Sequence, residues 1–189
     1  MGESKFPGPA LNFGHPLAAV ELSAGVDHTP IVKSLVWPDE TATQLFAAAL
    51  ARQPGLRHAL IELRGDLGAG KTTLVRHLLR ALGVAGRVKS PTYAVVEPYE
   101  LPSLQVWHFD FYRFNDPREW EDAGFRDLFA SAGLKLVEWP EKAAGFLPRA
   151  DLVIRLEARD DATRDVTLSA QSTVGAALLQ AAGHGAGCP

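Results

Sequence analysis

A glycine-rich segment carries the clearest sign of chemistry in this sequence. Residues 65–72 read Gly-Asp-Leu-Gly-Ala-Gly-Lys-Thr and fit the pattern G-x-x-x-x-G-K-[ST]. In this pattern the backbone N–H groups curl around phosphate oxygens, and the positive end of the following helix faces the same anion. Lys71 adds a charge for the outer phosphates, and the hydroxyl of Thr72 can bind Mg²⁺. An apolar segment precedes the motif and an amphipathic one follows it, so we predict a phosphate-binding loop rather than a plain glycine turn with a solvated lysine.

Two acidic residues stand where such a loop would need them. Magnesium and an attacking water require orientation, commonly from an acid at the end of a neighbouring strand. Asp110 follows the apolar segment 106–109, and Glu138 follows the apolar segment 134–137. Either acid alone could be a helix cap or a solvated carboxylate, but their shared position at strand ends favours a functional role. The residues themselves leave open which acid contacts the metal.

The elements around these residues alternate between strand and helix. Period-two and apolar patterns predict strands at 34–37, 58–63, 93–99, 104–109, 134–138, 151–156 and 165–170. Helical spacing predicts helices at 40–52, 72–82, 117–130 and 173–182. The pairs 93–109 and 151–170 have the form of hairpins, hence antiparallel strands. We therefore expect an α/β domain with a mixed, partly antiparallel sheet.

Composition excludes several classes of protein. The chain has 189 residues, of which 47% are hydrophobic and 22% charged, and this rules out collagen, a coiled coil and a wholly disordered chain. A single cysteine, Cys188, excludes an internal disulfide framework and a four-cysteine zinc site. The formal net charge of −3 argues against a general positive field that would grip nucleic acid.

The ends of the chain differ from its middle. Residues 1–33 are rich in glycine and proline, and we expect a flexible N-terminal extension there, with a second flexible tail at 183–189. Residues 34–182 are expected to form one domain. Neither a run of about 18 apolar residues nor a convincing signal peptide is found, so we expect a cytoplasmic protein that does not engage a membrane.

Five motifs together resemble one known family. They are GDLGAGKTT at 65–73, KSPTY at 89–93, VEPY at 96–99, HFDFYR at 108–113 and LVEWPE at 136–141. In this order and at these spacings they resemble the bacterial tRNA threonylcarbamoyladenosine biosynthesis ATPase family TsaE, also called YjeE, over residues 35–179. The first motif alone is shared by many nucleoside triphosphatases, whereas the combination is specific. The segment before residue 35 has no counterpart in short members of the family.

The resemblance implies a P-loop NTPase-like three-layer fold and an activity. It implies a magnesium-dependent ATPase, with ATP and Mg²⁺ bound, that acts with the TsaD–TsaB pair. That pair takes part in installing threonylcarbamoyl on adenosine 37 of tRNAs that read codons beginning with A. The ATPase would permit repeated turnover of the complex without transferring the group itself, and it would meet tRNA only indirectly.

The resemblance also implies roles for individual residues. Lys71, Asp110 and Glu138 would be catalytic, and Thr72 and Glu138 would bind the metal. A switch-like loop would comprise Ser90, Pro91, Thr92 and Tyr93. The nucleotide would contact Gly65, Asp66, Leu67, Gly68, Ala69, Gly70, Lys71, Thr72, Thr73, Glu40, Thr43, Trp139 and Arg164.

Other conspicuous residues have plainer interpretations. We expect His108 to be a structural histidine within an apolar strand, and Trp107 and Trp120 to be packing aromatics. Arg113 could reach a phosphate, or it could pair with Asp110 or Asp116. The polar face that His77 shares with its neighbours on the helix is expected to be solvated.

Two further functions compete with an ATPase subunit. A P-loop kinase for a small metabolite would share the size and the loop, but the segment 116–126 holds two arginines amid four acids and makes a poor arginine lid. A nucleotide-dependent binding switch would differ from an ATPase only in its negligible turnover. ATP is favoured over GTP because the chain has no N-K-x-D guanine-reading segment.

Overall fold

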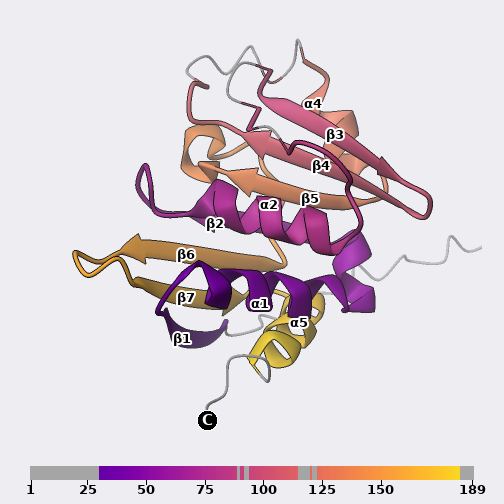
Figure 1. Ribbon diagram of the computed structural model, residues 1–189. Coiled ribbons are helices and arrows are strands. Elements are labelled where there is room, and N and C mark those ends of the chain that lie inside the picture. The colour runs from indigo at the N-terminus through magenta and orange to yellow at the C-terminus, as the bar shows by residue number, and fades with distance from the viewer. Residues whose placement is uncertain (1–29, 89, 92–93, 115–119, 121–122, 184–189) are drawn as a thin grey trace, which may run out of the picture.

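The computed structural model describes residues 30–88, 90–91, 94–114, 120 and 123–183, which form a single mixed sheet flanked by helices (Figure 1). Its described strands are β1 (Ile31–Trp37), β2 (Leu60–Arg64), β3 (Val96–Leu101), β4 (Leu104–Asp110), β5 (Leu134–Glu138), β6 (Leu152–Ala158) and β7 (Arg164–Ala170). The described helices are α1 (Glu40–Ala51), α2 (Lys71–Ala81), α4 (Phe125–Ala130) and α5 (Thr173–Gly183), with 3₁₀ turns η1 (Pro54–His58) and η2 (Pro140–Ala143).

The strand order is β1-β7-β6-β2-β5-β4-β3. The central strand β2 runs parallel to β5 and β6, and β4 runs parallel to β5. The outer pairs β3–β4, β6–β7 and β1–β7 are antiparallel. The predicted mixed, partly antiparallel sheet and both predicted hairpins are therefore confirmed. Because parallel strands end at the same edge, the carboxyl ends of β2, β4 and β5 lie together.

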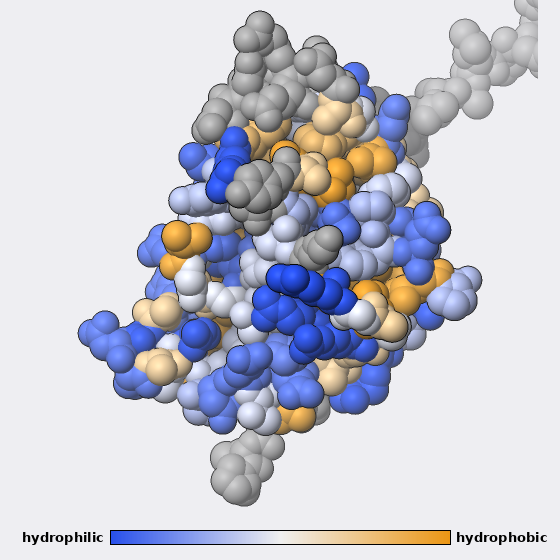
Figure 2. Space-filling view, turned by 45° about the horizontal axis from the view of Figure 1, so that its top comes forward, coloured by the Kyte–Doolittle hydropathy of each residue, from blue (hydrophilic) through white to orange (hydrophobic). Residues whose placement is uncertain are grey.

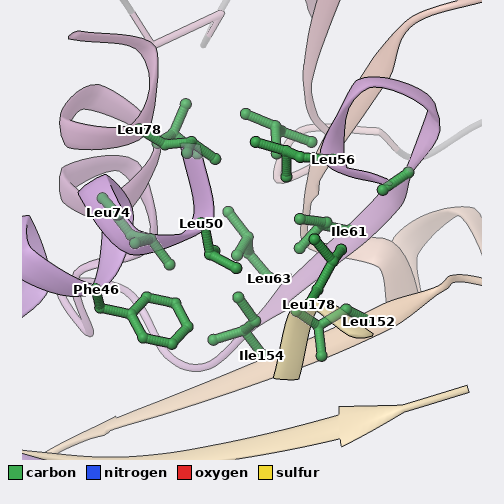
Figure 3. Close-up of a cluster of buried hydrophobic side chains, with 14 of the residues drawn as sticks. Phe46, Leu50, Leu56, Ile61, Leu63, Leu74, Leu78, Leu152, Ile154 and Leu178 are labelled. Carbon is green, nitrogen blue, oxygen red and sulfur yellow. The ribbon is translucent and has the colours of Figure 1, made fainter. Parts of the chain in front are cut away.

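The molecule has three layers, with the sheet between helices on its two faces. A hydrophobic cluster joins the sheet to the helices on each face. Helices α1, α2 and α5 cover one face (Figure 1), and their apolar side chains pack against those of the central strands. In Figure 3, Phe46 and Leu50 of α1 lie beside Leu74 of α2, and Ile61 and Ile154 of the sheet face them. The second cluster is aromatic and packs α4 against the other face of β4 and β5. Parallel strands covered on both faces are expected to be buried along their whole length, as β5 is.

Several element boundaries differ from the sequence expectation. Strand β1 begins at Ile31, so residues 31–33 belong to the sheet rather than to a flexible extension. Strand β3 begins at Val96 instead of residue 93, since Val95 has a positive φ of 63°. The helix expected over 117–130 is confirmed for its last part, α4, which begins at Phe125 because Gly124 turns with φ 66°. Residues 117–119 and 121–122 lie outside the described residues. Residues 1–29 and 184–189 lie outside the described residues.

Smaller differences follow from local geometry. Strand β2 begins at Leu60 rather than residue 58, because Pro54–His58 form a 3₁₀ turn that buries Leu56. Helix α1 starts where the sequence indicated, because the Asp39 side chain accepts a 2.9 Å hydrogen bond from the backbone N–H of Ala42 and caps the helix. None of the helices within the described ranges is long and apolar enough to cross a membrane.

Candidate nucleotide-binding site

The loop between β2 and α2 has the backbone that an anion cradle requires. Gly65, Gly68 and Gly70 have φ of 135°, 83° and 108°, a region that side chains rarely enter. At Gly65 a Cβ atom would lie 2.1 Å from the carbonyl oxygen of Leu156, so that position also needs glycine for space. The loop ends at Lys71, the first residue of α2, which directs the N-terminal end of that helix into the loop.

The Lys71 side chain lies inside this loop and is 4% exposed. Its Nζ atom donates to the backbone carbonyls of Gly65 at 2.6 Å and Asp66 at 2.9 Å, and it lies 4.0 Å above the ring of Trp139. Burial lowers the pKa of Lys71, and the nearby carboxylate of Glu138 opposes that shift. Phosphate oxygens are charged acceptors and hence stronger partners for this ammonium group than carbonyls are.

Thr72 and Glu138 meet beside this lysine. Thr72 Oγ1 donates a 2.9 Å hydrogen bond to Glu138 Oε2, while His108 Nε2 lies 2.9 Å from the other carboxylate oxygen, Oε1. Glu138 ends β5 and is 2% exposed. Of the two candidate acids, Glu138 is therefore the one in contact with the predicted metal ligand Thr72.

The donor chemistry of this pair suits magnesium. A hydroxyl and a carboxylate are hard oxygen ligands, and Mg²⁺ at phosphate sites takes one or two protein oxygens and completes its shell with phosphates and water. Within the described ranges, no group of three or more His, Cys, Asp or Glu side chains could hold a metal by itself. The pair Thr72 and Glu138 thus fits a metal that arrives with a nucleotide.

Asp110 occupies the neighbouring strand end. In the register of β4 against β5 it stands directly opposite Glu138. Its Oδ2 accepts a 3.1 Å hydrogen bond from Ser90 Oγ, and its Oδ1 accepts a 3.0 Å bond from the backbone N–H of Tyr112. Ser90 of the predicted switch-like loop is therefore tied to the predicted hydrolytic acid. Pro91 of that loop accepts from the Val95 N–H, and Thr92 and Tyr93 lie outside the described residues.

One cavity of about 400 Å³ joins these groups. It is lined by Leu67, Gly68, Gly70, Lys71, Thr72, Thr73, Ser90, Asp110, Tyr112, Arg113 and Trp139. Tyr112 was not predicted from the sequence, although it lies inside the HFDFYR motif. Its ring lies 5.0 Å from that of Trp139, and Trp139 itself adopts a left-handed backbone with φ 56°. A larger groove of about 640 Å³ is lined by Arg149 and Arg155 among others. No residue of the glycine-rich loop at 65–72 lines it.

A small cavity of about 70 Å³ adjoins the loop on the side of α1. It is lined by Trp37, Glu40, Thr43, Gly70, Thr73 and Arg164, so the predicted outlying residues do gather beside the glycine-rich loop. Arg164 Nε donates a 3.2 Å hydrogen bond to the carbonyl of Ala69 within that loop. Gly70 and Thr73 line both cavities, which makes the two spaces neighbours.

Three other predictions can be compared with the structure. Trp120 is buried in the aromatic cluster and Trp107 packs against that cluster, as expected. His77 is not merely solvated, because its Nε2 lies 2.8 Å from Glu40 Oε1 and links α2 to α1. The surface over these two helices is otherwise largely hydrophilic (Figure 2), in keeping with the polar positions of α2. His108 is buried as expected, but it contacts Glu138 instead of apolar groups alone.

Comparison with known proteins places this geometry in a family. The family model described as "Threonylcarbamoyl adenosine biosynthesis protein TsaE" matches residues 37–166, from the end of β1 into β7, and this range includes the loop and both acids. The chain belongs to the TsaE family. Members named tRNA threonylcarbamoyladenosine biosynthesis protein TsaE are similar over most of their length.

Two relatives and one solved structure illustrate this similarity. The TsaE protein of Haemophilus influenzae is 43% identical over 136 residues, which cover 72% of this chain and 85% of that protein. The TsaE protein of Bacillus subtilis is 35% identical over 143 residues, covering 74% and 87%. The crystal structure of Bacillus subtilis YdiB superposes with a TM-score of 0.66 at 24% identity, over 83% of this chain and 97% of that one. This likeness confirms the predicted α/β P-loop NTPase-like fold.

Proposed function

We propose that this protein is a magnesium-dependent ATPase of tRNA threonylcarbamoyladenosine biosynthesis. One observation carries the enzymatic part of the proposal: Lys71, Thr72 and Asp110 line a single cavity, and Thr72 is hydrogen-bonded to Glu138. Membership of the TsaE family carries the pathway, because relatives that are 43% and 35% identical are named for it.

Each of these residues would have a separate role in the transfer of a phosphoryl group from ATP to water. The backbone N–H groups of the loop and the Lys71 ammonium would hold the outer phosphates, where negative charge accumulates as the terminal bond breaks. Mg²⁺, bound by Thr72 and Glu138, would supply further charge neutralisation at those phosphates. Asp110, whose carboxylate already accepts two hydrogen bonds at the cavity wall, would orient the attacking water.

The remaining predicted contacts support the nucleoside. Glu40, Thr43 and Arg164 line the small cavity next to Gly70 and Thr73, and they would border the base. Trp139 would lie beside the nucleotide through its position over Lys71. The switch-like loop would follow the state of the terminal phosphate through the bond between Ser90 and Asp110.

Family membership and the net charge of the chain indicate which partners the protein would have. We place the protein with a TsaD–TsaB pair in the cytoplasm, where it would permit repeated turnover of the modifying complex. A formal net charge of −3 favours contact with tRNA through protein partners over direct binding of the phosphate backbone.

The test is hydrolysis of ATP by the purified protein, with and without Mg²⁺ and with and without a TsaD–TsaB pair. We expect phosphate release that requires Mg²⁺ and rises when the pair is added. Lys71→Ala should lower the rate by about a hundredfold or more, because it removes a charge that acts on the transition state. Lys142→Ala is the matched control, since that lysine is exposed and lies outside the cavity. Wild-type hydrolysis by Lys71→Ala would contradict the assignment.

The competing functions give different results in the same assay. A kinase would transfer labelled phosphate to an added acceptor rather than to water. A nucleotide-dependent binding switch would bind ATP without turnover, and a TsaD–TsaB pair would leave its rate unchanged.

A further inference from the structure

His108 is the most enclosed polar side chain near the cavity. It is 0% exposed, and it lies in β4 two residues before Asp110, so the two side chains point to the same face of the sheet. Val106, two residues earlier again, belongs to the hydrophobic cluster beneath α2. The imidazole is therefore enclosed by the core, and only Nε2 has a hydrogen-bond partner among the described residues, namely Glu138 Oε1 at 2.9 Å.

The chemistry of that contact determines which nitrogen carries hydrogen. An ionised carboxylate only accepts hydrogen bonds, so the bond to Glu138 requires hydrogen on Nε2 of His108. In the neutral imidazole, Nδ1 then presents a lone pair, and the ring of His108 has no N–H left without an acceptor. The ring nitrogen without a hydrogen-bond partner is Nδ1, and in this tautomer Nδ1 carries no hydrogen.

Glu138 is consequently held at both oxygens. Oε1 faces His108 and Oε2 faces Thr72, and the carboxylate is 2% exposed. A buried carboxylate needs such partners, because desolvation without hydrogen bonds is costly. When a metal binds, the Thr72 hydroxyl would turn from Glu138 toward the metal. His108 lies within a strand of the sheet, so its hydrogen bond to Glu138 would remain.

We infer that His108 is a positioning residue for the metal site: its Nε2–H holds one oxygen of Glu138 so that the other faces Thr72 and the arriving magnesium ion. The inference rests on the proposed magnesium-dependent function and assigns this histidine a role beyond packing. Hydrogen bonds of this kind orient ligands, and their loss commonly weakens metal affinity by about 10–100-fold.

Three substitutions separate positioning from packing. His108→Gln keeps an N–H donor at the distance of Nε2 from the backbone. His108→Asn places its amide at the distance of Nδ1, too short to reach Glu138, and so is a polar control. His108→Leu removes the donor and fills a similar space with apolar atoms.

The readout is the Mg²⁺ concentration that gives half-maximal binding of a fluorescent ADP, measured beside kcat and KM for ATP. We expect this concentration to rise about tenfold or more in the Asn and Leu variants and to stay within about threefold of wild type in the Gln variant. Nucleotide binding in EDTA should be equal in all folded variants. A folded Leu variant with wild-type Mg²⁺ dependence would overturn the inference, as would equal losses in the Gln and Asn variants.

A measurement on the unsubstituted protein covers the case in which buried variants fail to fold. Long-range ¹H–¹⁵N spectra of the nucleotide-free protein report the tautomer of each of its six histidines. We expect the Nε2–H form for His108, retained when Mg²⁺ and ADP are added. The Nδ1–H form would overturn the inference while leaving the proposed function intact. A wild-type protein without any Mg²⁺ dependence would overturn both.

Discussion

Thr72 and Glu138 are 66 positions apart in the chain, and their side chains meet in a 2.9 Å hydrogen bond. The contact follows from strand order: β5 lies beside β2 in parallel, with Leu63 opposite Glu138, so Glu138 stands next to the loop that leads from β2 into α2. A hydroxyl at the start of a helix and a carboxylate at the end of a strand thereby form one oxygen-rich corner beside Lys71.

This corner predicts a separation of nucleotide binding from hydrolysis. Glu138→Gln keeps the shape of the side chain but removes the charge that would bind Mg²⁺, so hydrolysis should fall by about a hundredfold or more. Binding of ADP in EDTA should remain within about twofold of wild type, because Lys71 and the loop are untouched. Phosphate release and fluorescent-ADP binding measure the two effects. The exposed neighbour Glu141 provides the control, Glu141→Gln, and loss of EDTA-resistant binding by Glu138→Gln would contradict the prediction.

Asp110 should matter for hydrolysis alone. Asp110→Asn preserves volume and removes the charge that would orient water, and we expect kcat to fall by about 10²–10⁴-fold with little change in KM. Ser90→Ala removes only the 3.1 Å bond to Asp110 Oδ2 and should cause a smaller loss, about tenfold or less. Steady-state kinetics with ATP measure both. A kcat for Asp110→Asn near that of wild type would show that another group orients the water.

Arg164 should affect affinity more than chemistry. Its Nε bonds to the carbonyl of Ala69, so it supports the backbone of the loop from β7. Arg164→Ala should raise the dissociation constant for ADP about tenfold, equivalent to about 1.4 kcal/mol, and leave kcat near wild type. Arg159→Ala is the matched control, because Arg159 pairs with Asp165 in the same hairpin and lies outside both cavities. If Arg164→Ala and Arg159→Ala changed the dissociation constant for ADP equally, the prediction that Arg164 supports the loop would be refuted.

The glycines of the loop should differ in their tolerance of a side chain. Gly65→Ala would drive a Cβ atom to 2.1 Å from the Leu156 carbonyl oxygen as well as straining φ, and we expect it to lower the free energy of unfolding by about 3 kcal/mol or more. Gly68→Ala strains φ alone, with no atom within 4 Å of the added Cβ, and should cost about 1 kcal/mol. Urea denaturation without nucleotide compares them. If Gly65→Ala lowered the free energy of unfolding no more than Gly68→Ala does, the close approach of residue 65 to the Leu156 carbonyl would be disproved.

Burial of Lys71 predicts a pH dependence of stability. Its pKa lies below the ordinary 10.5 in the folded protein, chiefly because of desolvation. Between that lowered value and 10.5 the unfolded chain binds more protons at this group than the folded protein does, so its contribution to stability rises with pH. The free energy of unfolding of wild type minus that of Lys71→Met should therefore increase as pH approaches 10.5. Denaturation curves without nucleotide measure it, and a flat or falling difference would contradict the burial argument.

Local patterns were sufficient for much of the site. The glycine, lysine and threonine spacing predicted the loop at residues 65–72, since its backbone depends on neighbours in the chain. Asp110 and Glu138 were identified because each directly follows an apolar strand. The boundaries that were wrong, at residues 31, 96 and 124–125, depend on pairing with β7 or on backbone turns that apolar periodicity does not encode.

The sequence by itself determined the groups that could bind phosphate and magnesium, because each is recognised from residue type and adjacency along the chain. Only the tertiary structure decided that Glu138 rather than Asp110 contacts Thr72, since strand order is a property of the whole sheet. It also placed His108 against Glu138 and Trp139 over Lys71. These contacts join residues from separate elements, and they exist because packing the helices on a twisted sheet brings the carboxyl ends of neighbouring parallel strands to one edge.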